Sequence, residues 1–448
     1  MKINKDLAAE HLAGAIRFKT ISQRDPAQTD RKAFLGLHGY LKKTYPKVHH
    51  VMKRETINEL SLLYTWPGSD RQAEPILLMA HLDVVPAEDG VGETWTRSPF
   101  GGDMDGAFVW GRGALDVKDA VIGIMEAAEG LIADGFKPKR TVYISFGHDE
   151  EVLGNRGAAE ISRVLAGRGV RLAFTLDEGG FIRDAVMPGL KKPAALVGIA
   201  EKGYLSLELS ARDAGGHSSM PPRRTAAGRI ARALCRLEKK PFPPRLTGPV
   251  QAMFRTLGSE AVQPFRIFYR NIGLFRKIFL KMLAASPQTD AMIRTTIAPT
   301  MLEGSETENV MPQRVMAVVN LRVLPGETRE GVLSRVRAVI KDPDVEIAAR
   351  ENSSDPSPVS DTGSPEYGAL RDVIISLFPG IVVAPFLMVG ATDSRHFAAV
   401  SRQVFRFTPA RIGADDMGRV HGIDERICID NFADIIAFYA ALIRKTAL

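Results

Sequence analysis

Short apolar runs separated by a helical pattern dominate the first 200 residues. Residues 76–80, 142–146 and 172–176 are apolar runs that predict buried strands, and residues 119–131 have the spacing of a helix. Strands separated by helices predict an α/β sheet with helices on both of its faces. The same character returns near the end of the chain, where helices are predicted at 367–377 and 429–443.

The pattern changes near Gly203. Two segments, 205–209 and 316–321, alternate between apolar and polar residues, which indicates strands with one solvated face. Between and after them lie two predicted amphipathic helices and a further strand, at 225–237, 329–340 and 345–347. This β-α-β-β-α-β order predicts a small ferredoxin-like α+β domain inserted into the first domain.

We therefore expect two domains. The α/β catalytic domain comprises residues 1–200 and 354–448, and the inserted lid or dimerisation domain comprises 201–353. The insert contains more residues, near 240–298, than a β-α-β domain needs. Part of this excess, 265–283, is mostly apolar and carries only basic charges. It is interpreted as a helix packed on its own domain, as an interfacial helix that touches anionic lipid, or, as we favour, as a wall or lid over an apolar channel.

Composition narrows the class of protein. A chain of 448 residues is too long for one ordinary core. The N-terminal segment lacks the apolar run of a signal peptide, and no stretch is long and apolar enough to span a bilayer. Two cysteines, Cys235 and Cys428, make no disulfide framework, so a reducing cytoplasm is expected. The net charge of +7 comes from scattered basic residues without a nucleic-acid motif, and it attracts carboxylates only weakly.

Acidic residues and histidines follow several of the predicted strands. His81 and Asp83 alternate on extended chain, so Asp83 could bond the far nitrogen of His81. Asp116 follows a glycine-rich turn and precedes a helix. Taken alone, His81 is the kind of histidine that is usually structural, and Asp116 is an ordinary helix N-cap.

Three more clusters share this placement. They are Asp149-Glu150-Glu151, Asp177-Glu178 and His421 with Asp424-Glu425. Such carboxylate runs usually lie in solvent, but after buried strands they indicate a nearby cation. Two histidines with several carboxylates form a ligand set for zinc or a similar ion. Two such ions would need a carboxylate that bridges them.

Jointly, these motifs resemble one metallopeptidase family. It contains carboxypeptidase S, glutamate carboxypeptidase, aminoacylase-1, acetylornithine deacetylase and succinyl-diaminopimelate desuccinylase. The resemblance runs over nearly the whole chain through the segments HLDVVP, GRGALDVKDA, FGHDEEVLGNRGA, LDEGG, GGHSSMPP, ENVMP and HGIDERI. It is strongest to the carboxypeptidase S branch, which includes enzymes that hydrolyse and form N-fatty-acyl amino acids.

The resemblance implies a role for each metal-site residue. Two zinc ions are expected, with cobalt or manganese as substitutes. One ion would be held by His81 and Asp177 and the other by Glu151 and His421, while Asp116, often followed by a cis peptide bond, would bridge both. Asp83 would orient His81, and Glu150 would be the general base.

The resemblance also assigns residues to the substrate. His217 would stabilise the oxyanion, either within one chain or from the partner in a homodimer, although a glycine-rich turn often holds an ordinary exposed histidine. Matches to substrate-binding positions are Asn309, Arg322, Gly390, Thr392 and Arg395. Arg322 could grip a carboxylate with two hydrogen bonds or be a plain surface charge. Thr392 could bind a carboxylate at a helix N-terminus or simply cap that helix.

The predicted function is metal-dependent hydrolysis of an amide bond next to a free carboxylate, by a carboxypeptidase or an N-acyl amino acid amidohydrolase. A dipeptidase, a tripeptidase or a short-chain deacylase is the alternative within the same chemistry. A non-catalytic binding protein on the same scaffold is the alternative of another class, and retention of Glu150 argues against it because binding needs no base.

Overall fold

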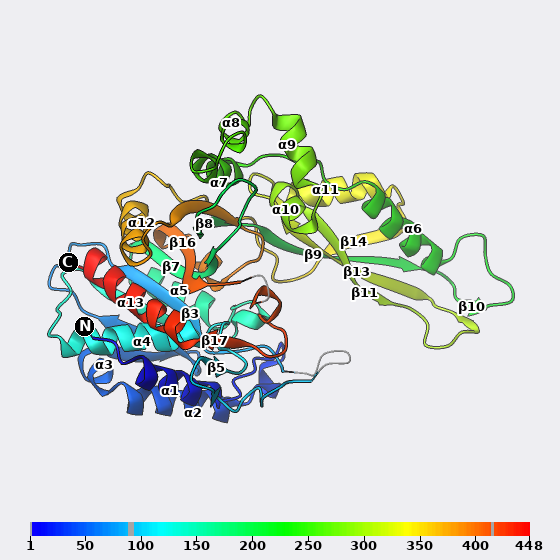
Figure 1. Cartoon of the computed structure of the whole chain (residues 1–448). Helices are drawn as coiled ribbons and strands as arrows, with labels where there is room; N and C mark the ends of the chain where they lie inside the picture. Colours follow the sequence, from blue (N-terminus) through cyan, green and yellow to red (C-terminus); the bar gives the residue numbers. More distant parts are fainter. Residues whose placement is uncertain (1, 88–93, 414–415) are drawn as a thin grey trace.

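Eight strands form one mixed sheet in the computed structural model of the chain, which describes residues 2–87, 94–413 and 416–448 (Figure 1). In order across the sheet they are β1 (Lys53–Ile57), β2 (Ser61–Trp66), β6 (Val142–Gly147), β3 (Ile76–His81), β7 (Leu172–Arg183), β16 (Ser401–Arg411), β8 (Ala194–Glu201) and β15 (Val382–Met388). The central strands β6, β3, β7 and β16 run parallel, whereas β1 and β2 are antiparallel. The predicted α/β class is confirmed.

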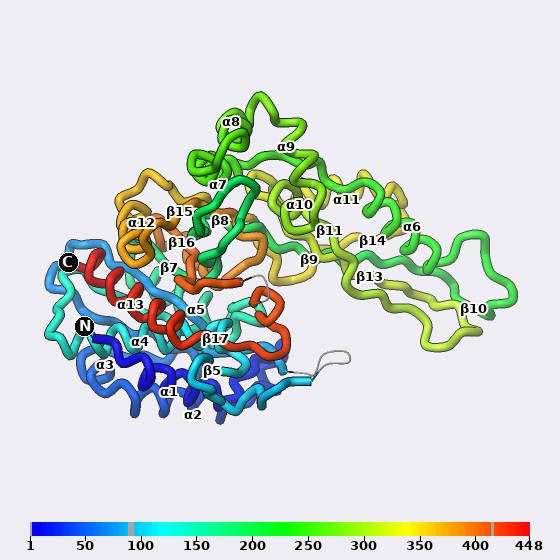
Figure 2. Tube along the Cα trace, in the orientation of Figure 1, coloured from blue at the N-terminus to red at the C-terminus, as the bar shows by residue number. Residues whose placement is uncertain are grey.

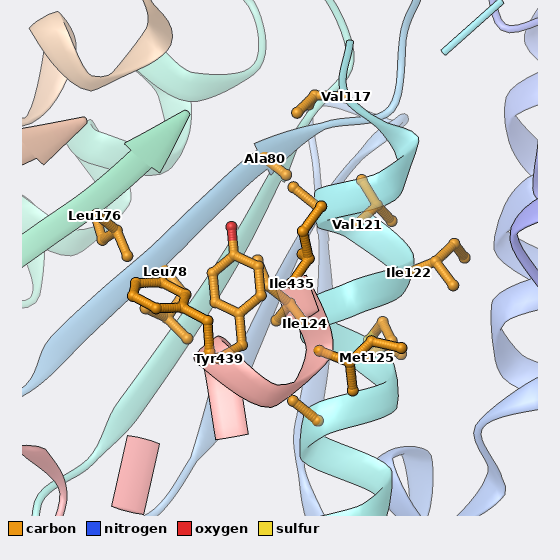
Figure 3. Close-up of a cluster of buried hydrophobic side chains, with 14 of the residues drawn as sticks. Leu78, Ala80, Val117, Val121, Ile122, Ile124, Met125, Leu176, Ile435 and Tyr439 are labelled. Atoms are coloured by element: carbon orange, nitrogen blue, oxygen red, sulfur yellow. The ribbon is translucent and has the colours of Figure 1, made fainter. Parts of the chain in front are cut away.

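Helices cover both faces of this sheet. One face packs against an apolar layer made by α1 (Lys5–Ile16), α2 (Arg31–Thr44), α3 (Pro46–Val51), α4 (Lys118–Ala133), α12 (Pro365–Leu377) and α13 (Ile429–Thr446). Figure 3 shows its centre, where Leu78 of β3 and Leu176 of β7 meet Val121 of α4 and Tyr439 of α13. The other face packs against α5 (Ala158–Gly167). This layering fixes the ends of β3 and β7, where the predicted ligands lie.

A small three-stranded sheet joins the chain's last third to the segment before α4. It consists of β17 (Arg426–Cys428), β5 (Phe108–Trp110) and β4 (Asp103–Met104). The Gly111 amide donates a hydrogen bond of 2.8 Å to the Glu425 carbonyl oxygen beside it. This pairing places the residues before β17, including His421, next to the turn that carries Asp116.

The inserted domain extends away from the large sheet (Figure 2). Its elements follow the predicted order: β9 (Gly203–Arg212), α6 (Ala226–Lys239), β11 (Thr296–Glu303), β13 (Arg314–Val323), α11 (Arg329–Ile340) and β14 (Val345–Ala349). The antiparallel sheet has the order β11-β13-β9-β14, and both helices pack on the same apolar cluster. A two-residue pair, β10 (Gly216–His217) and β12 (Val310–Met311), forms the far tip. The ferredoxin-like insert is confirmed.

Four short helices fill the extra segment of this domain. They are α7 (Gly248–Ser259), α8 (Phe265–Arg270), α9 (Arg276–Leu283) and α10 (Pro287–Ile293). The segment 265–283 is therefore two helices rather than one, because the chain breaks at Asn271 and Gly273 between them. Their buried side chains share one cluster with β8 and β15 of the large sheet. None of the helices in the described residues is long and apolar enough to cross a membrane.

Candidate metal centre

His81, Asp116 and Glu178 form the first group of candidate metal ligands. His81 is the last residue of β3, and its Nε2 lies 3.1 Å from Asp116 Oδ1 and 3.3 Å from Glu178 Oε1. Asp116 lies in the turn before α4, and its peptide bond to Val117 is cis, as the resemblance implies. Its carboxylate caps no helix, since the N-cap position of α4 is Val117. All the candidate ligand atoms lie within 4.8 Å of one another.

Asp116 also belongs to a second group, with Glu151 and His421. His421 Nε2 lies 2.9 Å from Asp116 Oδ2 and 3.3 Å from Glu151 Oε2. The two oxygens of Asp116 therefore face different histidines. This is the arrangement that a carboxylate bridging two metal ions requires.

Asp177 lies outside both groups, which differs from the predicted ligand set. Neighbouring residues of a strand face opposite sides of the sheet, and β7 continues past Leu176 to Arg183. The Asp177 carboxylate therefore points away from His81 and accepts a hydrogen bond of 2.8 Å from the backbone N–H of Ser394. Glu178, named above in the Asp177-Glu178 cluster but not as a metal ligand, occupies the position beside His81.

Asp83 supports the first group and the neighbouring acidic turn together. Its Oδ1 lies 3.3 Å from His81 Nδ1, the ring nitrogen that faces away from the metal group. The same carboxylate accepts hydrogen bonds from the backbone N–H groups of Glu150 and Glu151, at 3.2 and 3.1 Å, and from the Ser22 hydroxyl. Burial opposes ionisation, but these contacts outweigh it and lower the pKa of Asp83. Its charge thus orients both a candidate ligand and the candidate base.

Glu425 holds the turn that carries Asp116. Its buried Oε1 accepts hydrogen bonds from the backbone N–H groups of Gly113, Leu115 and Asp116, at 3.0, 2.8 and 3.2 Å. Its Oε2 pairs with Arg112 at 2.6 Å, and Arg112 also donates to the His421 carbonyl oxygen. Neither the pairing of Arg112 with Glu425 nor its support of the turn is predictable from the sequence, because a buried ion pair looks like two surface charges in a hydropathy pattern.

The residues fit a pair of divalent cations. Three carboxylates and two imidazoles converge, and Glu151 Oε1 is buried with no hydrogen-bond partner among the described residues. Burial, together with the charge of Asp116, raises the pKa of Glu178 to about 7. Hydrogen bonds to the carboxylates of Asp116 and Glu151 raise the pKa of His421 to about 10. A cation at this position would favour ionised carboxylates and neutral histidines, the forms that bind metal.

Metal binding is expected to release protons. Because the pKa of His421 is raised to about 10, its ring is protonated in the metal-free protein at pH 8 and must lose that proton to become a ligand. Apparent metal affinity should therefore rise by about tenfold per pH unit at pH 7–8. Below about pH 7, where Glu178 also takes up a proton, the dependence should steepen. Zinc titrations of chelator-treated protein in weak buffer with a pH indicator measure this release, and zinc binding at pH 8 without it would contradict the ligand role of His421.

Glu150 lies beside the metal ligands but belongs to neither group. It begins the short 3-10 helix η2 (Glu150–Val152), so its side chain diverges from that of Glu151. Burial raises the pKa of the Glu150 carboxyl, and the neighbouring carboxylates of Asp393 and Glu178 raise it further. A carboxylate with an increased proton affinity, next to candidate metal sites and not consumed as a ligand, has the properties of a general base.

Two guanidinium groups, those of Arg322 and Arg395, interact electrostatically with each other, and Arg322 also interacts with Glu150. Arg322 of β13 stacks over the Tyr204 ring, 4.8 Å from the ring centroid, and lines a cavity of about 790 Å³ between the large sheet and the inserted domain. Arg395, in η3 (Asp393–Phe397), donates to the Leu153 carbonyl oxygen. Burial lowers the pKa of Arg322, and the charge of Arg395 lowers it further, while Glu150 acts in the opposite direction. An anion between the two guanidinium groups would relieve their repulsion.

The carboxylate-binding role of Thr392 stays a prediction, but both of its donors contact another residue in this structure. Its backbone N–H and its hydroxyl both donate to Oε2 of the buried Glu201, at 3.0 and 3.3 Å. The helix that follows is only a short 3-10 helix. Gly390, two residues earlier, is half-buried, and a side chain there would meet open space.

His217 and Asn309 lie together, but far from the metal ligands of the same chain. His217 pairs with Val310 between β10 and β12, and the Asn309 carbonyl accepts a hydrogen bond from the Ser218 amide. Figure 1 places β10 at the far end of the inserted domain. The His217 ring is exposed, and its Nδ1 lies 2.8 Å from Ser219 Oγ and accepts a hydrogen bond of 3.1 Å from the Ser219 backbone N–H.

The aromatic side chains of the extra segment do not line the cavity described above. Phe279 is fully buried against Phe254, with ring centroids 4.7 Å apart, and Phe268 packs on the same cluster. The cavity has no lining residue from α7 to α10. Phe279 is a core residue, and the interpretation of this segment as a wall of an apolar channel, which the family resemblance makes a channel for an acyl chain, stays a prediction.

Comparison with known proteins agrees with the geometry. Probable carboxypeptidase S-like 2 of Dictyostelium discoideum is 41% identical over 442 residues, which cover 98% of this chain and 85% of that protein. N-fatty-acyl-amino acid synthase/hydrolase PM20D1 of Xenopus tropicalis is 40% identical over 441 residues, with 98% and 85% covered.

The solved structures show the same fold. The M20 family metallo-carboxypeptidase Sso-CP2 from Sulfolobus solfataricus superimposes with a TM-score of 0.72 at 17% identity, over 100% of both chains. Human carnosine dipeptidase 1 superimposes with a TM-score of 0.66 at 16% identity, over 99% of this chain and 96% of that one. Residues 77–445 match peptidase family M20/M25/M40. The chain therefore belongs to this peptidase family and is a metal-dependent hydrolase.

Proposed function

We propose that the chain hydrolyses the amide bond between an acyl or peptidyl group and an amino acid with a free carboxylate. The observation that carries this proposal is that Arg322 lines the cavity and interacts electrostatically with both Arg395 and Glu150, the residue before the candidate ligand Glu151. Guanidinium groups bind carboxylates through paired hydrogen bonds. The relatives named as a carboxypeptidase and as an N-fatty-acyl-amino acid synthase/hydrolase support it, because both names describe substrates that contain an amino acid.

We propose two zinc ions as the native metals. His81, Asp116 and Glu178 would hold one, and Asp116, Glu151 and His421 the other. Carboxylate and imidazole ligands also accept cobalt or manganese. When bound, such ions activate water and polarise the substrate carbonyl.

The residues of the chain perform the proton transfers and the positioning. Glu150 accepts the proton of the attacking water and then delivers it to the leaving amine. Asp83 keeps the backbone of Glu150 and Glu151 in place through its two oxygens. Arg322 and Arg395 hold the carboxylate, which aligns the amide bond with Glu150.

His217 would stabilise the oxyanion from the partner chain of a homodimer, since it lies at the far tip of its own chain. The edge strand β11 would be a candidate surface for such pairing, since Leu302 is exposed there beside α6. Mixing inactive His217→Ala protein with inactive Asp116→Ala protein should restore part of the activity. No recovery under conditions of subunit exchange would contradict a role in trans.

Turnover of zinc-loaded protein on a panel of N-acyl amino acids and peptides tests the substrate class. The panel contains N-acetyl and N-oleoyl amino acids, dipeptides, and the C-terminal amide of each compound. Hydrolysis of the acids with little turnover of the amides is expected. A requirement for a free α-amine would instead favour a dipeptidase.

The cytoplasmic location inferred from the cysteines stays a prediction.

Arg322→Ala is expected to raise KM for carboxylate substrates by about 10- to 100-fold, since charge-assisted hydrogen bonds to a buried anion contribute about 1.5–3 kcal/mol. The matching amides should change little, because they carry no charge for the guanidinium to bind. Arg350→Ala is the control, as Arg350 lines the same cavity but pairs with Glu208. An equal effect of Arg322→Ala on acids and amides would remove this residue from carboxylate binding.

A further inference from the structure

The helices α8 and α9 expose large apolar side chains at an extremity of the molecule (Figure 1). Leu274, in the turn between them, is 81% exposed, and Ile278 and Ile267 are 62% and 57% exposed. The opposite sides of the same helices bury Tyr269 and Phe279 in the cluster shared with β15. The two helices therefore have apolar side chains both on the side that packs on the protein and on the side that faces solvent. An ordinary surface helix has polar residues on its solvent side.

The charges around these exposed side chains are all of one sign. Residues 261–289 contain five basic residues and no Asp or Glu. All five are exposed: Arg266, Arg270, Arg276, Lys277 and Lys281. Neighbouring basic residues do form ion pairs, Lys192 with Glu260 and Arg294 with Asp290, but none of the five pairs with an acidic side chain in the described part of the chain. The exposed apolar side chains and these five basic residues together are called the α8–α9 face.

This face matches the chemistry of an anionic lipid surface. Apolar side chains that enter the boundary between headgroups and acyl chains, flanked by Lys and Arg that meet the lipid phosphates, characterise peripheral membrane binding. Aromatic contacts, such as the tilted pair Phe268 and Phe279 with ring centroids 5.6 Å apart, fix the buried side of the helices. The exposed side chains are thus held on a rigid support and need no folding on contact.

We propose that the α8–α9 face docks the protein onto anionic membranes as a peripheral protein. The proposal goes beyond the hydrolytic function and does not depend on it, because the face lies outside both metal-ligand groups and the cavity between the domains. A docked enzyme would meet substrates that partition into lipid at a raised local concentration. Binding to vesicles and hydrolysis in solution are separate measurements, so each can fail alone.

Co-sedimentation of the full-length, zinc-loaded protein with vesicles tests the proposal. Binding is expected to vesicles of phosphatidylcholine with 30% phosphatidylglycerol, to be weak with phosphatidylcholine alone, and to decrease as salt increases. Lys277→Glu with Lys281→Glu should lower the partition coefficient by about 30-fold or more, because each basic residue near such a surface contributes about 1 kcal/mol. Leu274→Asp with Ile278→Asp should lower it by at least about tenfold.

The matched control substitutions are on α2, which is distant in sequence from the α8–α9 face. Leu35 is 50% exposed, and Lys42 and Lys43 are exposed. One control is Leu35→Asp, which replaces an exposed apolar side chain, and the other is Lys42→Glu with Lys43→Glu, which reverses two exposed basic charges. These variants should bind vesicles like the unaltered protein, and all variants should keep its melting temperature and its activity in solution. Two results would overturn the proposal: equal binding to neutral and anionic vesicles, or loss of a dimer in the Leu274 and Ile278 variant, which would show that a second copy covers the face.

Discussion

Glu150→Gln is expected to keep its full metal content and to lose about 10²–10⁴-fold in kcat, the range typical of a lost general base. Glutamine has the same shape but cannot accept the proton of the attacking water. Glu150 lies outside both ligand groups, so the substitution removes no metal ligand. Metal analysis and steady-state kinetics on the same preparation measure the two quantities together.

The neighbouring carboxylate provides the matched control. Glu151→Gln makes the same change one residue later, but Glu151 Oε2 lies 3.3 Å from His421 Nε2 within the second ligand group. It should lose metal as well as activity, and added zinc should restore part of the rate. A Glu150→Gln protein with near-normal kcat would show that another group accepts the proton.

Periodicity predicted the elements that have one clear apolar face. The helix at 329–340 was predicted with the bounds that α11 has, and β3 extends only one residue beyond the predicted strand. The strands β15 and β16 were not predicted. Pro385 interrupts β15, which is tolerated because β15 is at the edge of the sheet. β16 contains Arg406, which is fully buried and pairs with Glu201 at 3.1 Å, and a hydropathy pattern cannot anticipate a buried ion pair.

The motifs indicated which segments meet at the metal centre, but not which side chain of each segment faces it. His81, Asp116, Glu151 and His421 lie in the ligand groups, whereas Asp177 was chosen where the geometry favours Glu178. The alternation of side chains along a strand decides between them once the orientation of β7 is known. Leu176 is apolar and faces α4, so Glu178, two residues later on the same side of β7, points toward the N-terminus of α4 and Asp116. The roles of Thr392 and Glu425 depended on long-range contacts that have no local pattern.

The choice between Asp177 and Glu178 can be decided by a matched pair of substitutions. Glu178→Gln and Asp177→Asn each remove one negative charge and keep the shape of the side chain. Asp177 is expected to tolerate the change, because an asparagine oxygen can still accept the hydrogen bond from the Ser394 N–H. Glu178 should not, because its oxygen lies 3.3 Å from His81 Nε2 in the first group.

Glu178→Gln is therefore expected to weaken binding of one of two zinc ions by more than about 100-fold, beyond the roughly 10- to 100-fold loss typical of a residue that only supports a ligand. Zinc per chain after dialysis against a weak chelator should fall from about two ions to about one, as expected when one site of a two-metal centre is lost. Because the remaining site still contains Asp116, Glu151 and His421, the protein should stay folded and bind that ion normally. If Asp177→Asn lost one zinc ion and Glu178→Gln kept both zinc ions, Asp177 would be the ligand. The side chains of Asp177 and Glu178 on β7 would then have to change orientation when metal binds.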